Sequence, residues 1–197
     1  TEADRVGGVR TALGDRRADR VIVAGGAWTG KLLESTGLSL PVVPVRGQMV
    51  LFAGPANLLH RILLSGERYL IPRRDGRVLV GSTLEHTGFE KVTTEAALEE
   101  LKAAAFRIFP GLKKFPVQTQ WAGLRPASPT GIPFIGEHPC ISGLYLNAGH
   151  FRNGVVMGLA SARLLSDMVL QRKPIIDPVP YLPGDSTAPE QGSMDFV

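Results

Sequence analysis

The alternation of apolar and polar positions predicts short strands and a short helix in the first quarter of the chain. Two β-branched runs, RVGGVRT and ADRVIVAGG, flank the turn signal ALGDRR and predict an opening hairpin. Within the second run, RVIVA (20–24) is continuously apolar and ends at Gly25-Gly26, which is typical of a buried strand. AWTGKLLESTGL then predicts a short helix that closes near Gly37.

The middle of the chain reads as antiparallel strands followed by a helix. PVVPV (41–45) is too rich in proline for a central strand and predicts a connector. After Arg46, GQMVLFAG predicts a strand, and RYLIPRRDGRVLVGST predicts a hairpin that turns at Asp75-Gly76. Residues 93–109 form an amphipathic helix on the same reasoning, because apolar residues recur there at helical spacing. These residues are Ala97, Leu98, Leu101, Ala105 and Ile108.

The last third returns to strands and ends in a long helix. VQTQWAGLRP (117–126) predicts a strand that stops at Pro126, and GLYLNAG (143–149) predicts another. A helix follows from about Gly154 to Gln171, with small residues along it. The remainder is rich in proline, serine and glycine, which favours a flexible tail.

These patterns predict an α+β (α/β) fold made of two domains, one of them discontinuous. The texture of the sequence changes near residues 45 and 120. Residues 1–45 and 121–173 are expected to form pieces of one domain, and residues 46–120 an antiparallel-sheet domain with a helix. Residues 174–197 form the expected tail. The opening residues read as the interior of a β-rich segment, so we expect a C-terminal portion of a longer polypeptide.

Composition and charge exclude several classes of partner. The apolar fraction of 44% and charged fraction of 20% are those of an ordinary globular protein. The net charge of +4 is scattered, and the arginine clusters at 15–20 and 72–77 carry no interleaved aromatics, so we expect no nucleic-acid partner. No apolar run approaches the roughly 20 residues needed to cross a bilayer, so no transmembrane segment is expected. The composition is compatible with a homo-oligomer as well as with a monomer.

Cysteine usage points to a reducing compartment and against a metal site. The single cysteine, Cys140, excludes an internal disulfide, which fits a cytoplasmic protein. His138 and Cys140 offer two soft ligands where a zinc site needs three or four, so no metal is expected.

GHFRNG (149–154), placed between a strand and a helix, is the first candidate for chemistry. A helix that begins there aims unpaired backbone N–H groups at one point, and its macrodipole favours negative charge. Such a corner would stabilise a reduced flavin ring, and Gly154 and Gly158 would allow close approach. A strand–turn–helix that only packs, with Arg152 reaching solvent, is the alternative.

Arg125 in WAGLRP (121–126) and Tyr69 in YLIP are the second candidates. An arginine among apolar neighbours at a strand end requires an anionic partner, and its guanidinium pairs with a carboxylate through two parallel bonds. That partner is either a substrate carboxylate or a protein Asp or Glu. The Tyr69 hydroxyl could bond a carboxylate too, although an aromatic at a strand start is usually part of the core.

Five segments together resemble a known family of flavoenzymes. VIVAGGAWTGKL, VPVRGQM, YLIPRRDGRVLVGST, WAGLRPASPTGIPFIG and GHFRNGVVMG occur in the order and spacing of FAD-dependent amine and amino-acid oxidases. Over residues 5–172 the chain resembles the D-amino acid oxidase family, and within it the glycine oxidases of thiamine biosynthesis. D-amino acid dehydrogenases and the flavin subunit of hydrogen cyanide synthase are similar over the same span. AGGAW alone would be weak, whereas WAGLRP with GHFRNG is specific.

The resemblance implies roles for individual residues. Arg125 matches the family's carboxylate-binding arginine, Tyr69 the tyrosine that assists it, and Arg152 a second arginine of the substrate site. The strand end that packs beside the adenosine half of FAD is matched by Ala24, Gly25 and Gly26. The loop and helix start that contact the isoalloxazine ring are matched by His150, Phe151, Arg152, Asn153, Gly154, Val155 and Val156.

Two departures and one absence qualify what the resemblance implies. Leu84 stands where glycine oxidases carry a methionine, and Glu67 where one carries a histidine, which leaves the exact amine open. The cysteine of covalently flavinylated members is lacking, so non-covalent FAD is expected. The family's G-x-G-x-x-G turn for the pyrophosphate does not occur in this sequence.

The resemblance implies an oxidoreductase that transfers hydride from a small amino acid or amine to FAD. Dioxygen or a quinone would take the electrons, and no residue serves as a dedicated acid or base. Oxidation of a D-amino acid or a hydroxy acid on the same scaffold is the alternative activity. A non-catalytic module is the alternative from another class, and the absent phosphate-binding turn favours it.

Overall fold

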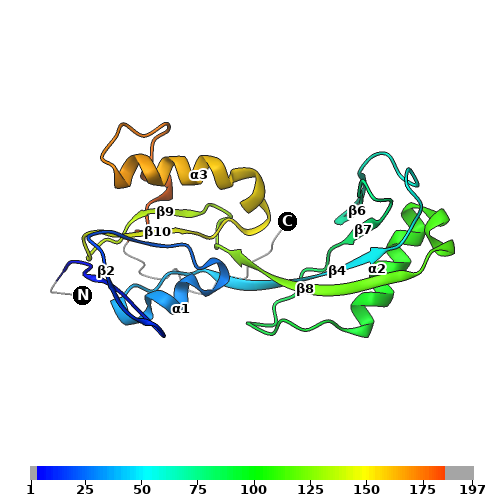
Figure 1. The fold of residues 1–197 in the computed structure, drawn as a ribbon, viewed down its shortest axis with the longest axis horizontal. Helices are drawn as coiled ribbons and strands as arrows, with labels where there is room; N and C mark the ends of the chain where they lie inside the picture. The colour runs from blue at the N-terminus through cyan, green and yellow to red at the C-terminus, as the bar shows by residue number, and fades with distance from the viewer. Residues whose placement is uncertain (1–3, 185–197) are drawn as a thin grey trace. The chain divides into compact units, whose positions relative to one another are not determined.

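The computed structural model describes residues 4–184, and the chain divides into two compact units (Figure 1). The first unit combines Thr1–Pro44 with Arg125–Val197, and the second is Val45–Leu124. The predicted class, helices combined with antiparallel sheet, is confirmed. Of the predicted tail, residues 185–197 lie outside the described residues. No helix within the described range is long and apolar enough to span a membrane.

A three-stranded sheet with a helix on each face forms the centre of the first unit (Figure 1). Its strands, in order across the sheet, are β3 (Val21–Val23), β10 (Leu144–Ala148) and β9 (Phe134–Glu137). The central strand β10 runs parallel to β3 and antiparallel to β9. Helix α1 (Thr29–Leu33) lies on one face and helix α3 (Gly154–Val169) on the other.

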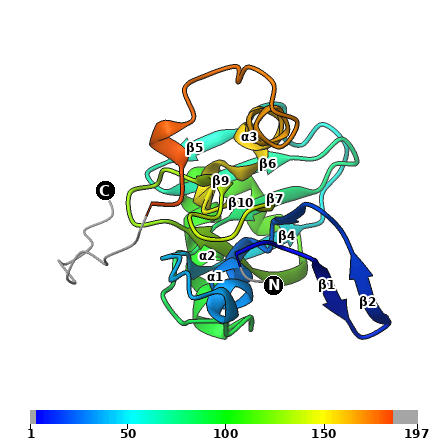
Figure 2. The same ribbon diagram turned by 90° about the vertical axis from the view of Figure 1, so that its left-hand side faces the viewer.

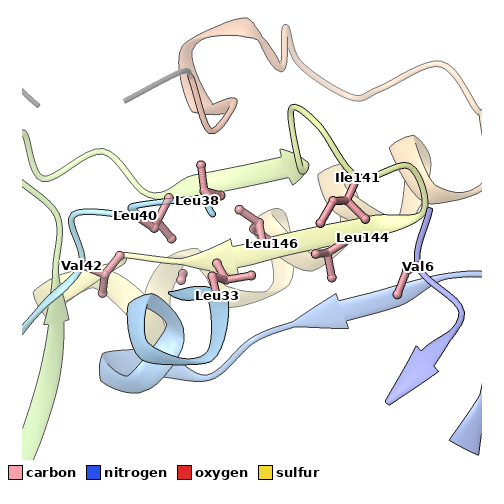
Figure 3. Packing of buried hydrophobic residues seen from close by; sticks show 9 residues of the cluster. Val6, Leu33, Leu38, Leu40, Val42, Ile141, Leu144 and Leu146 are labelled. Atoms are coloured by element: carbon pink, nitrogen blue, oxygen red, sulfur yellow. The ribbon is translucent and has the colours of Figure 1, made fainter. Parts of the chain in front are cut away.

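Alternation along β10 sends side chains to two separate cores. Leu144 and Leu146 pack against Leu33 of α1 in the cluster that Figure 3 shows. Tyr145 points to the other face and packs with Leu164 and Leu165 of α3. Because side chains of a strand alternate between faces, a five-residue strand is enough to hold both helices.

The predicted opening hairpin is wrong in its second arm. The hairpin pairs β1 (Gly8–Thr11) with β2 (Gly14–Arg17), the ribbon drawn in dark blue in Figure 2. The segment read as a turn is therefore a strand, and the Thr11 hydroxyl closes the tighter turn by donating to the Gly14 carbonyl at 2.8 Å. RVIVA pairs with β10 instead, because parallel pairing lets Val21 and Val23 join the first-unit core.

Two further expectations are wrong in part. The strand β3 is not buried, since Ile22 is exposed on the face that α1 does not cover, at the edge of a small sheet. The supposed connector 41–45 contributes to strand β4, which begins at Val43 and runs to Phe52. Proline is tolerated there because Pro44 lies at the very start of the strand, where a ladder hydrogen bond is not required.

The second unit is a five-stranded sheet covered on one face by a helix. Its strands, in order, are β5 (Leu63–Ser65), β6 (Arg68–Pro72), β7 (Val78–Gly81), β4 and β8 (Val117–Ala127). The predicted hairpin is confirmed as β6 and β7, and the predicted helix as α2 (Glu95–Ile108). Leu101 and Ala105 of α2 pack on Val50, Leu70 and Val80 of the sheet.

Candidate functional site

Two of the segments expected to contact a cofactor meet at one edge of the first-unit sheet. Strands β3 and β10 are parallel, and Val23 pairs with Leu146 near their carboxyl ends. Residues 24–26 follow the first strand, and the GHFRNG loop follows the second. In sheets with parallel strands, ligands bind outside the carboxyl ends of such strands. Residues 24–26 and the GHFRNG loop therefore lie at the end of these strands where ligands bind in such sheets.

The end of β8, which carries Arg125, is tied to the GHFRNG loop. Ala127, which lies two residues beyond Arg125 on β8, forms an antiparallel bridge with His150. Gly149 has φ +84°, and a Cβ there would lie 3.2 Å from Ser128 and 3.3 Å from Phe134. Arg125 itself is half-buried. The bridge and the close approach at Gly149 hold the arginine's strand end beside the loop within one unit.

His150 anchors the loop to helix α3. Its Nε2 lies 2.9 Å from the Ser161 hydroxyl, a buried group on the second turn of the helix. Burial lowers the pKa of His150 below its ordinary value, because a charged imidazole is poorly solvated there. The lowered pKa favours the neutral imidazole, and its hydrogen bond to Ser161 ties the loop to the helix.

The turn between His150 and α3 has an unusual backbone. Phe151 has φ +47°, in the left-handed region that bulky residues rarely adopt. Phe151–Asn153 form the 3-10 turn η4, in which Arg152 and Asn153 are exposed. Strained backbone of this kind concentrates at functional sites.

Helix α3 begins without a side-chain cap. It starts at Gly154, and the side chain of Asn153 in the capping position makes no capping hydrogen bond. The first N–H groups of a helix have no partner within the helix, and together with the macrodipole they attract negative charge. This helix start can therefore receive an anionic group.

The first turns of α3 also present apolar side chains outward. Val155 is 97% exposed, Val156 86% and Leu159 88%. Exposed apolar groups that cluster in this way mark binding surfaces. The uncapped helix start and these exposed side chains therefore leave backbone donors and apolar surface available to a ligand.

In the second unit, Tyr69 lies on the sheet face opposite helix α2. Its neighbour Leu70 faces α2, and side chains alternate along the strand, so Tyr69 points to the other face. Tyr69 pairs with Gly81 of β7, which in turn pairs with Met49 of β4. Leu84 follows β7 and is half-buried, whereas Glu67 precedes β6 and is exposed.

The sequence reasoning missed a buried polar network in the second unit. Gln48 of β4 is 0% exposed, and its side-chain nitrogen donates to Glu85 at 2.9 Å and to the Thr94 hydroxyl at 3.1 Å. Its side-chain oxygen accepts from the Thr94 backbone N–H at 2.8 Å and from Gln120 at 3.1 Å. All four hydrogen bonds of this amide are made, so it joins β4, the segment that follows β7, the start of α2 and β8.

An ion pair completes this network beside Leu84. Arg46, also buried, donates from Nε to Glu85 at 2.9 Å and from Nη1 to Glu90 at 3.0 Å. Burial opposes ionisation of Glu85, but hydrogen bonds from Thr83, Arg46 and Gln48 outweigh it and lower the pKa of this carboxyl. The available signal was the alternation itself, since Arg46 and Gln48 stand two apart in an otherwise apolar strand.

Comparison with known proteins places these features in a family. Residues 1–168 match the model of the FAD dependent oxidoreductase family. The chain is 54% identical over 182 residues to a glycine oxidase of Pseudomonas aeruginosa, covering 92% of this chain and 50% of that protein. It is 38% identical over 174 residues to the bifunctional protein ThiO/ThiG of Synechocystis sp., covering 86% of this chain and 26% of that protein.

Solved structures show the same fold. The crystal structure of glycine oxidase from Geobacillus kaustophilus superimposes with a TM-score of 0.87 at 29% identity, covering 95% of this chain and 52% of that one. The chain thus spans about half the length of the glycine oxidases it matches.

Proposed function

Because the chain belongs to the FAD-dependent oxidoreductase family, we propose that it forms the C-terminal half of an amino-acid oxidase. This enzyme oxidises the C–N bond of glycine, sarcosine or another small amino acid to an imine. The single observation that carries the proposal is the bridge between Ala127 and His150. It holds the strand end of Arg125 beside an uncapped helix start that fits a flavin.

Residues of this chain would hold FAD without a covalent bond. The segment 24–26 would pack beside the adenosine half, and residues 150–156 would contact the ring. Support comes from the uncapped start of α3 and the outward-facing Val155 and Val156. When bound, FAD supplies the redox chemistry, taking the hydride of the substrate Cα–H bond and passing the electrons to dioxygen or a quinone.

Arg125 would bind the substrate carboxylate through two parallel hydrogen bonds, since a guanidinium fork matches that group. The resemblance gives the Tyr69 hydroxyl an assisting role in carboxylate binding and gives Arg152 a place in the substrate site. The substrate amine must be neutral, because its lone pair forms the C=N bond as the hydride leaves. The rate would come from this positioning and from the positive end of α3, so no side chain needs to act as acid or base.

Arg125→Ala in the full-length oxidase tests the proposal. Loss of two charged hydrogen bonds should raise KM for glycine or sarcosine by about 100-fold or more, with a smaller effect on kcat. Arg17→Ala, which removes an exposed arginine of strand β2, is the matched control and should leave both constants unchanged. Unchanged turnover of small amino acids by Arg125→Ala would refute the assignment.

A second activity on the same scaffold is left open by Leu84 and Glu67. The resemblance places Leu84 where glycine oxidases carry a methionine and Glu67 where one of them carries a histidine, so a D-amino acid or a hydroxy acid is the competing substrate. Bleaching of the flavin absorbance by a panel of amines and hydroxy acids separates these two substrate classes.

The alternative that the chain is a non-catalytic module is tested by an absorbance spectrum of the chain after addition of FAD. A non-catalytic module predicts that no flavin is bound.

A further inference from the structure

Tyr69 and Gly81 occupy directly opposite positions on neighbouring antiparallel strands of the second unit. Opposite residues of such a pair project on the same face of the sheet, with Cβ atoms roughly 5 Å apart. Gly81 has no Cβ, and one built there would lie 2.6 Å from Cζ and from Oη of Tyr69, and 2.7 Å from Cε2. The Tyr69 ring therefore lies across β7, in the space that any side chain at position 81 would fill.

One ordinary reason for a glycine does not apply at position 81. The φ angle of Gly81 is outside the left-handed region, so φ alone does not require glycine there. Close approach of another group is a second ordinary reason, and it does apply, because the Tyr69 ring and hydroxyl lie where a Cβ at position 81 would be.

We infer that Gly81 is a positioning residue, whose missing side chain sets where the Tyr69 hydroxyl lies. The inference rests on the proposed function for its consequence, because Tyr69 there assists in binding the substrate carboxylate. A methyl group at position 81 would push the ring off β7 while leaving the hydroxyl present. Gly81 would then control carboxylate binding without touching substrate.

The position of the ring is tested in the chain itself, independently of activity. The chain has three tyrosines, so labelling with 3-fluorotyrosine should give three fluorine NMR signals, and Tyr69→Phe identifies that of Tyr69. Gly81→Ala should shift the Tyr69 signal and leave those of Tyr145 and Tyr181 in place. The matched control is Gly123→Ala in strand β8, where nothing lies within 4 Å of a built Cβ, and it should shift none. An unmoved Tyr69 signal in Gly81→Ala would overturn the inference.

Kinetics of the full-length enzyme test the consequence. Gly81→Ala should raise KM for a small amino acid about tenfold with less effect on kcat, the fold-change expected when one hydrogen bond to a charged group is lost. In a Tyr69→Phe background, Gly81→Ala should add little, because no hydroxyl is left to displace. Equal effects of Gly81→Ala in both backgrounds would overturn the inference.

A failure of the proposed function would give a different pattern of results from a failure of this inference. If Tyr69→Phe leaves KM unchanged while Gly81→Ala still shifts the fluorine signal, the carboxylate role of Tyr69 is wrong and the positioning of its ring stands. Should Gly81→Ala fold poorly, Gly81→Ala/Tyr69→Ala removes the clashing ring. The double variant must then unfold at a higher temperature than Gly81→Ala alone, and a lower midpoint would overturn the inference.

Discussion

Helices α2 and α3 differ in how their first turns are stabilised, although each packs one face on a sheet. The start of α2 is capped by Thr94, whose hydroxyl accepts the Ala97 N–H, and its apolar face is covered by the sheet of the second unit. The start of α3 has no side-chain cap, and Val155, Val156 and Leu159 face outward. The buried residues of α3 lie further along the helix and are Ser161, Leu164, Leu165 and Asp167.

The contrast separates residues that stabilise the fold from residues available for binding. In α2 the cap and the apolar contacts are satisfied within the second unit. In α3 the first turns leave backbone donors and apolar surface available, both of which a cofactor or another part of the enzyme can cover. A binding site at a helix start requires backbone N–H groups and apolar side chains that no part of the same unit already covers, and such a start is locally less stable.

The largest expected effect compares two leucines of α3. Leu164→Ala empties a fully buried position and should lower the free energy of unfolding by about 3 kcal/mol. Leu159→Ala on the outward face should change it by less than about 0.5 kcal/mol. Urea unfolding of the chain followed by circular dichroism measures both. A similar loss for the two variants would show that the first turns of α3 are packed after all.

The next largest effect concerns the ion pair between Arg46 and Glu85. Glu85→Gln keeps the shape but removes the carboxylate that faces buried Arg46, so the unfolding midpoint at pH 7 should fall by about 5 °C or more. The exposed pair of Glu99 and Lys102 supplies the control, since Glu99→Gln should have almost no effect.

The same carboxyl predicts a pH dependence. Because folding lowers the pKa of Glu85, the stability it contributes is present above the ordinary value near 4.5 and is lost as pH falls through the lowered pKa. Thermal midpoints measured from pH 7 to pH 3 should therefore fall less steeply in Glu85→Gln than in the unmodified chain. Parallel curves would mean that Glu85 does not drive acid unfolding.

Helix caps give a smaller effect. Thr94→Ala removes the cap of α2 and a partner of Gln48, and should cost about 1 kcal/mol or slightly more, whereas Thr94→Ser should recover most of it. Asn153→Ala, at the matching position of α3, should leave the stability of the chain nearly unchanged because no cap is lost. An equal loss of unfolding free energy in Thr94→Ala and Asn153→Ala would mean that the two helix starts are capped alike.

The smallest effect lies in the titration of His150. Burial lowers its pKa, so its proton NMR signal should titrate below the ordinary value of 6.5, and His150→Asn identifies the signal. Since the folded pKa is the lower one, the stability linked to this group is present above about pH 6.5 and declines as the pH falls. A midpoint at or above 6.5 would place the imidazole in solvent instead.

Local pattern was sufficient for most elements and for the motifs of the site. The helical spacing of Ala97 to Ile108, the Asp75-Gly76 turn and the strand before GHFRNG follow from short-range preferences, and each is present in the structure. One error was local, since the tight turn between β1 and β2 was read as a longer loop, and another arose where pairing is decided at long range. RVIVA has the residues of a strand, but only the tertiary structure shows that it pairs with β10 rather than with its neighbour in the sequence.

The sequence by itself determined most of the elements, the family resemblance and the identity of Arg125, Tyr69 and the GHFRNG loop as candidates. The tertiary structure decided which of them share an edge, that Gln48 joins four segments, and that Gly81 makes room for the Tyr69 ring. The physical reason is that propensity and periodicity act over a few residues. Hydrogen-bond partners and close approaches depend on residues that are tens of positions apart and meet only when strands pair.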